Sequence, residues 1–404
     1  MPNNQGKKKF KFSLRMPRQY NVAVQISLLV LCLFGTVMIL SVSSQDAAMD
    51  PLGSFKTLFR QMVFFVGGYI GMVILARNFT LSFAKKYSFL GMVVGILLLI
   101  FTFFFPNSYG IRAWISIPLP SPLPNFTIQP SEFMKLMIII FLAVYWGNCS
   151  PKMNYQFRDV FQMPILMVGI AALIVLRQPD FGSFAIIGFL VGILSLLPTH
   201  KVFRHFQRTM QIIIVVVVVF AFFLMSPLGI GIVKHIPFID GYQIQRFELA
   251  LNPFISNINE GYQLVNGLVA FFTGGLTGVG LGNSTHKYGY VPAAKTDSIL
   301  PIIVEETGMI GFGIIVVMYS ILIYQIFRYA FKINNIPAKM ILIGIASYFF
   351  IHFVLNVGGV SGLIPMTGIP LVFISLGGSS TLTGMLAIGV VQALISSYKR
   401  GEIM

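Results

Sequence analysis

Long apolar runs separated by short polar segments dominate the sequence. A helix needs about 20 apolar residues to cross the hydrocarbon core of a bilayer. Ten runs are interpreted as membrane-spanning helices on this basis, at about residues 22–44, 61–76, 87–105, 132–147, 161–176, 183–198, 209–226, 298–325, 339–357 and 370–396. The alternating segments of about 10 residues that mark a membrane β-barrel are absent. The pattern predicts an all-α polytopic membrane protein with about ten transmembrane helices.

Two polar segments between these runs are longer than the others. Segment 227–297, between the seventh and eighth predicted helices, holds amphipathic stretches near 242–251 and 261–272. Polar loops of this length are uncommon unless they are functional. The proline-rich segment 106–131 is expected to form an extended cap over the bundle. The predicted organisation is a basic tail at 1–21, one transmembrane domain at 22–398 that includes the large loop 227–297, and a tail at 399–404.

Composition and charge agree with a membrane protein. Hydrophobic residues make up 56% of the chain and charged residues 10%, which is far from the usual soluble balance. With the N-terminus in the cytoplasm, the cytoplasmic segments hold nineteen of the 28 cations but only Asp159 and Glu402 of the 12 acids. This distribution follows the positive-inside rule. We therefore expect both termini in the cytoplasm, the 227–297 loop outside the cell, and no nucleic-acid partner despite the net charge of +16.

Cysteine and histidine offer no metal site. Cys32 falls within the first apolar run and Cys149 near the end of the fourth, and they form neither a disulfide framework nor a metal-ligand spacing. The five histidines are scattered, and no two of them are four residues apart. The sequence predicts no metal bound by protein side chains alone.

The stretch 283–311 is the best candidate for chemistry. It begins polar, passes through Lys295 and Asp297, and enters an apolar helix whose first turns carry Glu305 and Glu306. Charges near membrane depth are expensive and usually mark function. Asp297 is therefore the candidate catalytic residue. The alternative is that Asp297 only caps the helix that follows it.

Other charges lie where predicted helices meet polar segments. Glu132 and Lys135, three residues apart, are expected to pair and to face the interior of the bundle. Arg177 and Asp180 flank the tight turn between the fifth and sixth predicted helices, and they are expected to hold each other, either as a turn lock or as part of a site. Arg112, close to an aromatic residue, suits contact with anionic headgroups or sugar rings.

Glycines cluster in three places. Segment 274–282 could be mistaken for a dinucleotide-binding loop, but no strand precedes it. We expect these glycines to let one backbone segment approach another, or a ligand, near the membrane face. The same interpretation applies to 356–359 and 377–380.

Four stretches, in the right order along the ten predicted helices, resemble the SEDS family (shape, elongation, division and sporulation), whose members include FtsW, RodA and SpoVE. They are IQPSEFMKL at 128–136, RQPDFGS at 177–183, the whole of 261–311, and NVGGVSGLIPMTGIPLVFISLGGSS at 356–380. The resemblance covers about residues 22–398. The segment GLGNSTHKYGY favours the division branch, FtsW, whereas MTGIPL is closer to the elongation branch, RodA.

The resemblance implies a peptidoglycan glycosyltransferase of the bacterial cytoplasmic membrane. Such proteins polymerise lipid II, a disaccharide-pentapeptide on undecaprenyl pyrophosphate, at the outer face of that membrane during division or elongation. Their implied partners are a class B penicillin-binding protein and other divisome or elongasome membrane proteins. The essential aspartate of the family falls on Asp297. The family's Glu and Lys of the fourth helix fall on Glu132 and Lys135.

The implied reaction sets requirements that these residues are expected to meet. A base must take the acceptor proton, which is the role predicted for Asp297. Side-chain cations or a divalent ion such as Mg or Mn must stabilise the departing pyrophosphate. The candidate substrate-binding residues are Arg112, Glu132, Lys135, Arg177, Asp180, Arg246, Lys287, Lys295 and Glu306.

Three positions depart from the family pattern. Many members have Glu, His and Tyr where this chain has Ala293, Lys295 and Leu376. An aspartate of ordinary pKa, about 3.9, is a poor base at neutral pH. Burial or the acids at 305 and 306 would raise the pKa of Asp297, whereas Lys295 would lower it.

Two other functions fit parts of the pattern. A lipid II flippase or other transporter would line its path with the charges of the fourth to sixth predicted helices. A non-catalytic scaffold would only hold the single helix of a penicillin-binding protein. No internal repeat of the kind common in transporters is visible, and the motifs concentrate on the predicted outer side. The enzyme is therefore the favoured interpretation.

Overall fold

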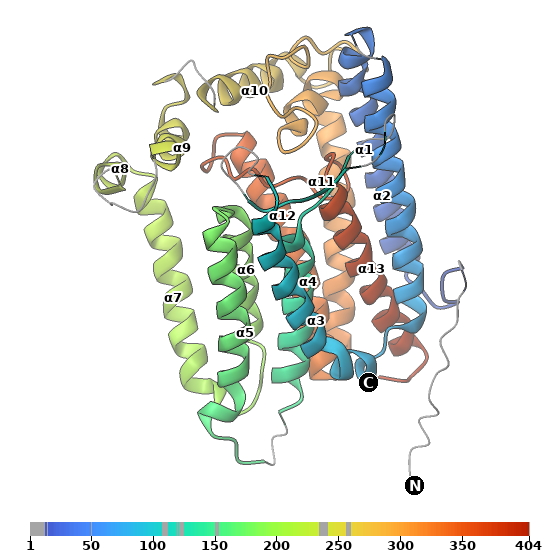
Figure 1. Ribbon diagram of the computed structural model, residues 1–404, viewed down its shortest axis with the longest axis vertical. Coiled ribbons are helices and arrows are strands. Elements are labelled where there is room, and N and C mark those ends of the chain that lie inside the picture. The colour runs from blue at the N-terminus through green and yellow to red at the C-terminus, as the bar shows by residue number, and fades with distance from the viewer. Residues whose placement is uncertain are drawn as a thin grey trace.

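The computed structural model describes residues 13, 15–49, 51–106, 112–118, 120, 125–149, 153–233, 241–255 and 260–403. Within these residues, nine helices are long and apolar enough to cross a membrane. They are α1 (Val22–Met49), α2 (Pro51–Asn78), α3 (Leu81–Phe101), α4 (Pro130–Gly147), α5 (Phe157–Arg177), α7 (Phe203–Leu224), α11 (Ile299–Lys332), α12 (Ile336–Val360) and α13 (Gly378–Lys399). A further apolar helix, α6 (Phe181–Ser195), has 15 residues. The predicted all-α architecture is confirmed (Figure 1).

Two predicted helices end or begin at different residues from those expected. The sixth was predicted to reach residue 198, but α6 stops at Ser195. Pro198 follows closely, and a proline disfavours helical geometry in the residue before it. The last was predicted from residue 370, but α13 begins at Gly378. The backbone turns tightly before it, and Phe373 has a left-handed φ of 72°.

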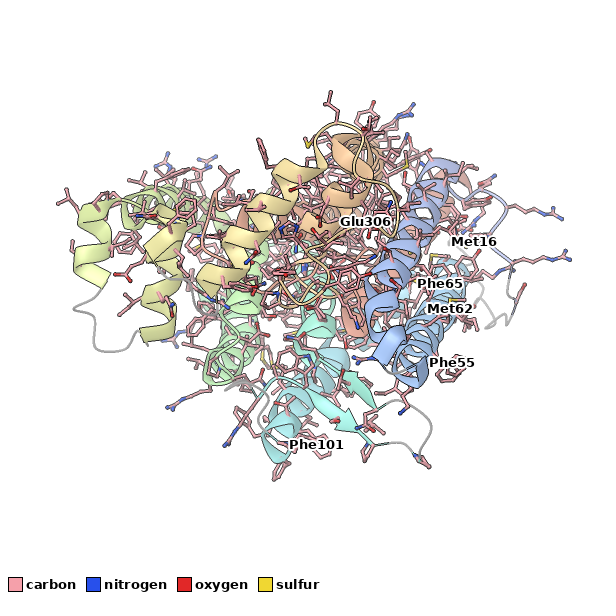
Figure 2. All side chains as sticks on the ribbon, turned by 90° about the horizontal axis from the view of Figure 1, so that it is seen from above. Met16, Phe55, Met62, Phe65, Phe101 and Glu306 are labelled. Atoms are coloured by element: carbon pink, nitrogen blue, oxygen red, sulfur yellow. The ribbon has the colours of Figure 1, made fainter. Side chains whose placement is uncertain are left out.

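Apolar side chains cover the outside of the bundle as well as its inside. Figure 2 shows Phe55, Met62 and Phe101 at the rim of the molecule, and Phe55 is 62% exposed. In α7, which stands at the edge of the bundle (Figure 1), none of the most apolar 18-residue window is buried. Water would disfavour so much exposed apolar surface, whereas lipid tails suit it.

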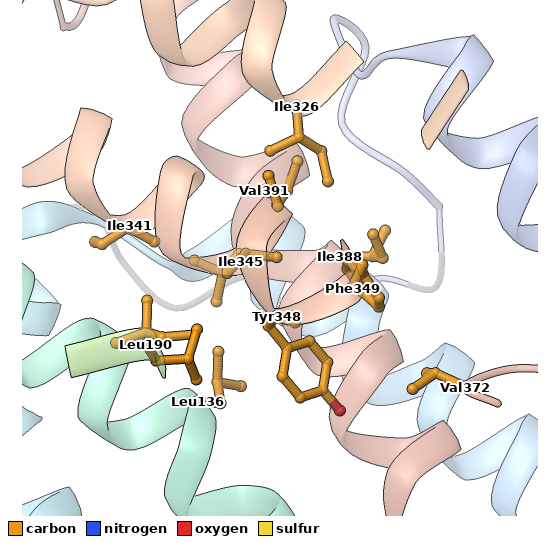
Figure 3. Close-up of a cluster of buried hydrophobic side chains, with 14 of the residues drawn as sticks. Leu136, Leu190, Ile326, Ile341, Ile345, Tyr348, Phe349, Val372, Ile388 and Val391 are labelled. Atoms are coloured by element: carbon orange, nitrogen blue, oxygen red, sulfur yellow. The ribbon is translucent and has the colours of Figure 1, made fainter. Parts of the chain in front are cut away.

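Three helices form the centre of the bundle. Most of the apolar windows of α4, α12 and α13 are buried inside the molecule, which is typical of helices that are hydrophobic on every face. α2 packs on α13, α3 packs on α4, and α11 packs between α1 and α12. Figure 3 shows the apolar side chains that meet at this centre, among them Leu136 of α4, Leu190 of α6, Ile345 of α12 and Ile388 of α13.

The large segment between α7 and α11 is mostly helical where the structure describes it. It contains α8 (Pro227–Val233), α9 (Gly241–Leu251), the 3₁₀ turn η2 (Pro253–Ile255) and α10 (Glu260–Gly274). The two amphipathic stretches expected in this segment are thus confirmed as α9 and α10. Both lie at the end of the bundle opposite the C-terminus (Figure 1), and α10 packs on α11.

The proline-rich segment is extended in its described part. After the 3₁₀ turn η1 (Thr102–Phe104), β1 (Ile115–Ile117) and β2 (Phe126–Ile128) form a two-stranded antiparallel hairpin in which Ile115 pairs with Ile128. Gln129, which follows β2, donates its backbone N–H to Ser379 Oγ at the start of α13, 2.8 Å away. The hairpin therefore lies against the same end of the bundle as the first turn of α13.

The start of α1 and the end of α13 lie at one end of the bundle. The backbone N–H of Asn21 donates to Gln392 Oε1 at 2.8 Å, and Gln392 Nε2 donates to Asn21 O at 2.9 Å. The Lys399 ammonium donates to Tyr20 O at 3.2 Å. Gln392 is fully buried, so this pairing holds the N-terminal segment firmly against α13.

α11 is broken at Gly308, where φ is 69° and ψ is −171°. The broken turn pairs with the segment that follows α10: Val279 N donates to Glu305 O at 2.9 Å, and Met309 N donates to Gly275 O at 3.0 Å. A Cβ atom at Gly308 would lie 2.2 Å from Leu276 O. The expectation that these glycines allow backbones to approach is confirmed, whereas the predicted eighth helix was not expected to be interrupted.

Gly308→Ala is expected to destabilise the protein by at least about 2 kcal/mol, because alanine must adopt a left-handed conformation and its Cβ would collide with backbone that cannot move aside. The midpoint of thermal unfolding in detergent measures the change. Gly313→Ala is the matched control, because it lies on the same helix with nothing within 4 Å of the added Cβ. Equal melting of the two variants would contradict this account of the break.

Candidate functional site

Asp297 lies in the turn that leads into α11 and is half-buried. The carbonyl of Ala293 closes this turn, accepting from Thr296 N at 2.9 Å and from Ser298 N at 3.3 Å. The residue at the N-cap position of α11 is Ser298, and no side chain makes a capping hydrogen bond there. The alternative that Asp297 serves as the helix cap is therefore not what the structure shows.

A small cleft opens beside Asp297. It encloses about 180 Å³, is open to solvent, and is lined by Asp297, Ser298, Asn356, Gly359, Val360, Met366, Thr367, Gly368 and Ile369. These residues come from the start of α11, the end of α12 and the connection between α12 and α13. Besides the Asp297 carboxylate, the lining offers hydroxyl and amide groups. A carboxylate in such a setting can accept a proton or hydrogen bond from a polar ligand.

The backbone on both sides of Thr296 is tied to the connection between α12 and α13. The N–H of Leu376 donates to Lys295 O at 2.8 Å. Asn356 Nδ2 donates to Asp297 O, also at 2.8 Å. The Thr296 hydroxyl donates to Asp297 Oδ1 at 3.0 Å. These contacts hold the turn in place at the edge of the cleft.

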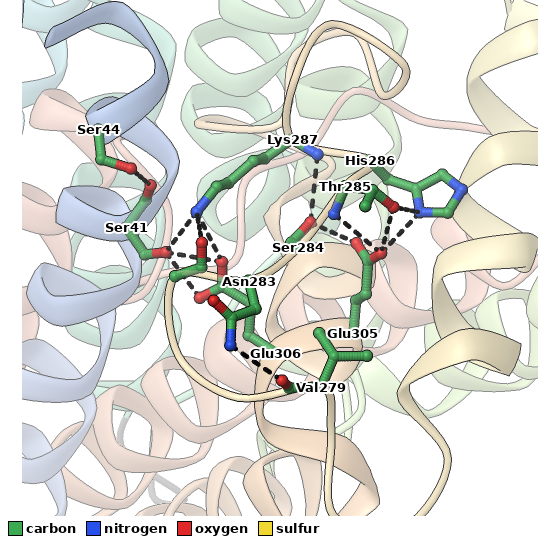
Figure 4. Close-up of polar contacts among 11 residues, drawn as sticks. Ser41, Ser44, Val279, Asn283, Ser284, Thr285, His286, Lys287, Glu305 and Glu306 are labelled. Carbon is green, nitrogen blue, oxygen red and sulfur yellow. Dashed lines mark hydrogen bonds and ion pairs between the residues drawn. The ribbon is translucent and has the colours of Figure 1, made fainter. Parts of the chain in front are cut away.

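Lys287 and Glu306 form a fully buried ion pair. Their Nζ and Oε1 atoms are 3.1 Å apart, and both side chains are 0% exposed. Ser41 of α1 donates to the Glu306 carboxylate at 2.7 Å, and Lys287 also donates to Gly282 O at 2.7 Å (Figure 4). Both residues were candidates for substrate binding. The structure instead encloses them, with Glu306 inside the molecule (Figure 2), where they join α1, α11 and the loop before α11.

Glu305 holds the same loop from the other side. It accepts hydrogen bonds from Ser284 Oγ, from Thr285 N at 3.2 Å and from His286 Nδ1 at 2.8 Å (Figure 4). Three donors on one buried carboxylate satisfy most of its lone pairs, which burial requires. The two acids that follow the candidate aspartate therefore hold the loop in position.

Glu132 and Lys135 pair inside the bundle, as expected. Lys135 Nζ lies 2.7 Å from Glu132 Oε1, and the side chains are only 3% and 1% exposed. Two residues of α12 complete the group: the Tyr348 hydroxyl donates to Glu132 Oε2 at 3.4 Å, and His352 Nε2 lies 3.4 Å from Lys135 Nζ. The group is closed on itself, and none of its members lines the cleft.

Asp180 does not pair with Arg177, so this expectation was wrong. Its carboxylate caps α6 by accepting from Ser183 N at 3.0 Å, and it also accepts from Gln129 Nε2 at 2.9 Å and Ser131 Oγ at 3.1 Å. Arg177 is exposed. The unpaired N–H groups at a helix start attract an aspartate at the N-cap strongly, and here Asp180 also joins the starts of α4 and α6.

The remaining candidate cations lie outside the lining of the cleft in the part of the chain that the structure describes. Arg112 is exposed next to β1, Arg246 is half-buried in α9, and Lys295 is half-buried two residues before the candidate aspartate. Sequence reasoning missed Asn356, which it interpreted only as part of a glycine motif. Its signal was available: an asparagine inside an apolar helix must find buried hydrogen-bond partners.

The family model for cell cycle proteins of the FtsW, RodA and SpoVE type matches residues 22–400. The chain belongs to this family. The family expected from the motifs is thus confirmed, with matches among division and sporulation proteins. The chain is 31% identical over 406 residues to "Probable peptidoglycan glycosyltransferase FtsW" of Lactococcus lactis subsp. lactis, covering 95% of this chain and 94% of the relative. It is 33% identical over 381 residues to "Stage V sporulation protein E" of Bacillus subtilis, covering 93% and 96%.

Solved structures of the family share this fold. A chain from a structure on the coordination of polymerization and crosslinking by a peptidoglycan synthase complex matches with a TM-score of 0.68 at 22% identity, covering 94% of this chain and 99% of the other. The rod shape determining protein RodA of Thermus thermophilus matches with a TM-score of 0.60 at 19% identity, covering 94% and 98%. At these identities the likeness concerns the fold.

Proposed function

We propose that this protein is a peptidoglycan glycosyltransferase that polymerises lipid II, with Asp297 as its general base. Relatives that match over nearly the whole chain are named as enzymes of this activity. The observation that carries the assignment of the base is the cleft beside Asp297, where the carboxylate is half-buried and the backbone around it is tied down. A polar cleft of this kind suits the hydroxyls of a sugar.

The proposed chemistry uses the carboxylate as a proton acceptor. Asp297 takes the proton of the acceptor sugar hydroxyl while its oxygen attacks the anomeric carbon of the donor. The bond from that carbon to the phosphate oxygen breaks, and undecaprenyl pyrophosphate leaves with the electron pair. Positive groups must stabilise this leaving group. Lys135 and Lys287 are enclosed in ion pairs, so we assign this role to the more accessible cations, Arg112, Arg177, Arg246 and Lys295.

A divalent cation such as Mg or Mn would need oxygen ligands. Among the described residues, no three His, Cys, Asp or Glu side chains come together in a group that could hold a metal ion. The described side chains therefore do not fit a metal cage, and no step of the proposed reaction depends on one.

We further propose that the cleft faces the outside of the cytoplasmic membrane and that both termini lie in the cytoplasm. Arg77 and Lys399 contact the N-terminal segment at one end of the bundle. Asp297 lies at the other end, with α10 and the loop before α11. The strong excess of cations in the segments at the first end supports a cytoplasmic location for that end.

The proposed partner is a class B penicillin-binding protein, which would cross-link the glycan as it forms. The structural likeness to a chain of a synthase complex that coordinates polymerization and crosslinking supports this partnership. The FtsW relatives favour work in cell division, together with other divisome membrane proteins.

The deciding experiment incubates the purified protein with labelled lipid II, with and without a class B partner and with and without Mg²⁺ or Mn²⁺, and resolves the products on a gel. Glycan polymer that depends on this protein supports the proposal. A parallel assay follows lipid II across empty liposomes. Translocation without polymer would favour a flippase, and polymerase-independent support of the partner's cross-linking would favour a scaffold.

A further inference from the structure

Asn356 holds two backbone carbonyls with one amide group. It lies in the last turns of α12, and its side chain is buried. Nδ2 donates to Asp297 O and to Ile369 O, each at 2.8 Å. An amide nitrogen carries two hydrogens, so both donors of Asn356 are used on these carbonyls.

The orientation of this amide follows from its neighbours. A flipped amide would place Oδ1 against two carbonyl oxygens, and acceptors do not bond to acceptors. In the observed orientation, Asn356 Oδ1 is buried and has no hydrogen-bond partner among the described residues. An unpaired buried acceptor costs about 1–3 kcal/mol. The position therefore favours asparagine for its two donors, despite the cost of its oxygen.

The two carbonyls belong to opposite walls of the cleft. One belongs to Asp297 at the start of α11, and the other to Ile369 in the connection between α12 and α13. Gly368, next to Ile369, faces the carboxylate so closely that a Cβ there would lie 3.8 Å from Asp297 Oδ2. By binding both walls, Asn356 sets the width of the cleft and the place of the carboxylate within it.

We propose that Asn356 is a positioning residue for Asp297. It acts on the backbone of the aspartate and on the facing wall, and it needs no contact with the substrate. The anchoring itself is a property of the fold, whereas its consequence for the rate rests on the proposed function. General bases lose efficiency quickly when displaced, since a misplacement of about 1 Å can cost about 100-fold in rate.

Hydrogen exchange tests the anchoring without any need for activity. Asn356→Leu removes both donors at similar volume, and Asn356→Ser leaves a single hydroxyl donor. The backbone amides of Thr296, Ser298 and Leu376 report on the turn, because each donates to a carbonyl of Ala293 or Lys295. We expect exchange in peptides that contain these amides to rise about tenfold or more in Asn356→Leu and less in Asn356→Ser, because two hydrogen bonds of about 1 kcal/mol each are lost or weakened.

Ser361→Ala is the matched control. Ser361 follows α12 directly, makes only a local hydrogen bond to Gly358 O at 3.2 Å, and does not line the cleft. Its exchange and its polymerisation rate should equal those of the parent. Unchanged exchange around 296, 298 and 376 in both Asn356 variants would overturn the proposal, and so would a rise that is uniform over the chain.

Kinetics then separates positioning from binding. With lipid II as substrate, kcat of Asn356→Leu should fall about tenfold or more while KM stays within about twofold, because a displaced base weakens the transition state but leaves substrate contacts in place. An equal kcat with raised KM would contradict a positioning role. If the parent protein formed no polymer, the proposed function would fail, and the exchange measurements would still decide whether Asn356 anchors the turn.

Discussion

Asp297→Asn is expected to lower the rate of lipid II polymerisation by about 100- to 10,000-fold, which is the usual contribution of a general base. The asparagine keeps the size and shape of the side chain, and its amide cannot accept the acceptor's proton. The main-chain carbonyl of residue 297 still receives the hydrogen bond from Asn356, so the turn should persist. Initial rates from the gel assay measure the loss, and co-purification with the class B partner checks that binding is retained.

Glu248→Gln is the matched control for this substitution. Glu248 lies in α9, within the same segment between α7 and α11, is half-buried like Asp297, and does not line the cleft. It removes one negative charge from the same end of the molecule. A variant at 297 that polymerises at the parent's rate, or a loss of equal size in both variants, would remove the aspartate from the mechanism.

Lys287→Met is expected to destabilise the protein by about 3–5 kcal/mol, because it leaves the carboxylate of Glu306 buried without its counter-ion. The effect should extend to polymerisation, since the ion pair joins the loop before α11 to α1 and α11. Glu306→Gln should cost a similar amount through the unpaired ammonium. Thermal and denaturant unfolding in detergent measure both variants.

The double variant Lys287→Met/Glu306→Gln separates a lost pair from an unpaired charge. Replacing both charges of a buried pair is often nearly neutral, so the double variant should recover most of the stability lost by either single variant. The cycle then gives a large coupling energy. The exposed pair Arg400–Glu402, at 2.8 Å, is the control, and breaking it should cost less than about 1 kcal/mol. Additive losses at 287 and 306 would show that the buried charges act independently.

The bundle and its family could be predicted from the sequence, because the signals involved are local. Apolar length alone marks a membrane helix, and every predicted run overlaps a helix of the structure. The pairing of Glu132 with Lys135 was predictable for the same reason, since residues three apart on a helix lie on one face. The role of the glycines in close backbone approach was also predictable, although the partner strand of the break at Gly308 was not.

The composition of the candidate site was only partly predictable. Asp297 was found as a charge at the start of an apolar helix. Its immediate neighbours were not, because Asn356 is 59 residues away along the chain. Asp180 was expected to bond within its own turn and instead contacts Gln129, 51 residues away. Local spacing cannot choose between a near partner and a distant one that offers better geometry.

The sequence by itself therefore determined the class of fold, the membrane-spanning helices, the family and the candidate base, since each depends on local apolar length or on a short motif. Only the tertiary structure decided which charges reach the cleft and which are enclosed. Lys287 and Glu306 have the composition of a substrate site, yet packing against Ser41 of α1 buries them completely. Burial and partners arise from contacts between distant segments, and the same packing left the Asp297 carboxylate beside an open cleft.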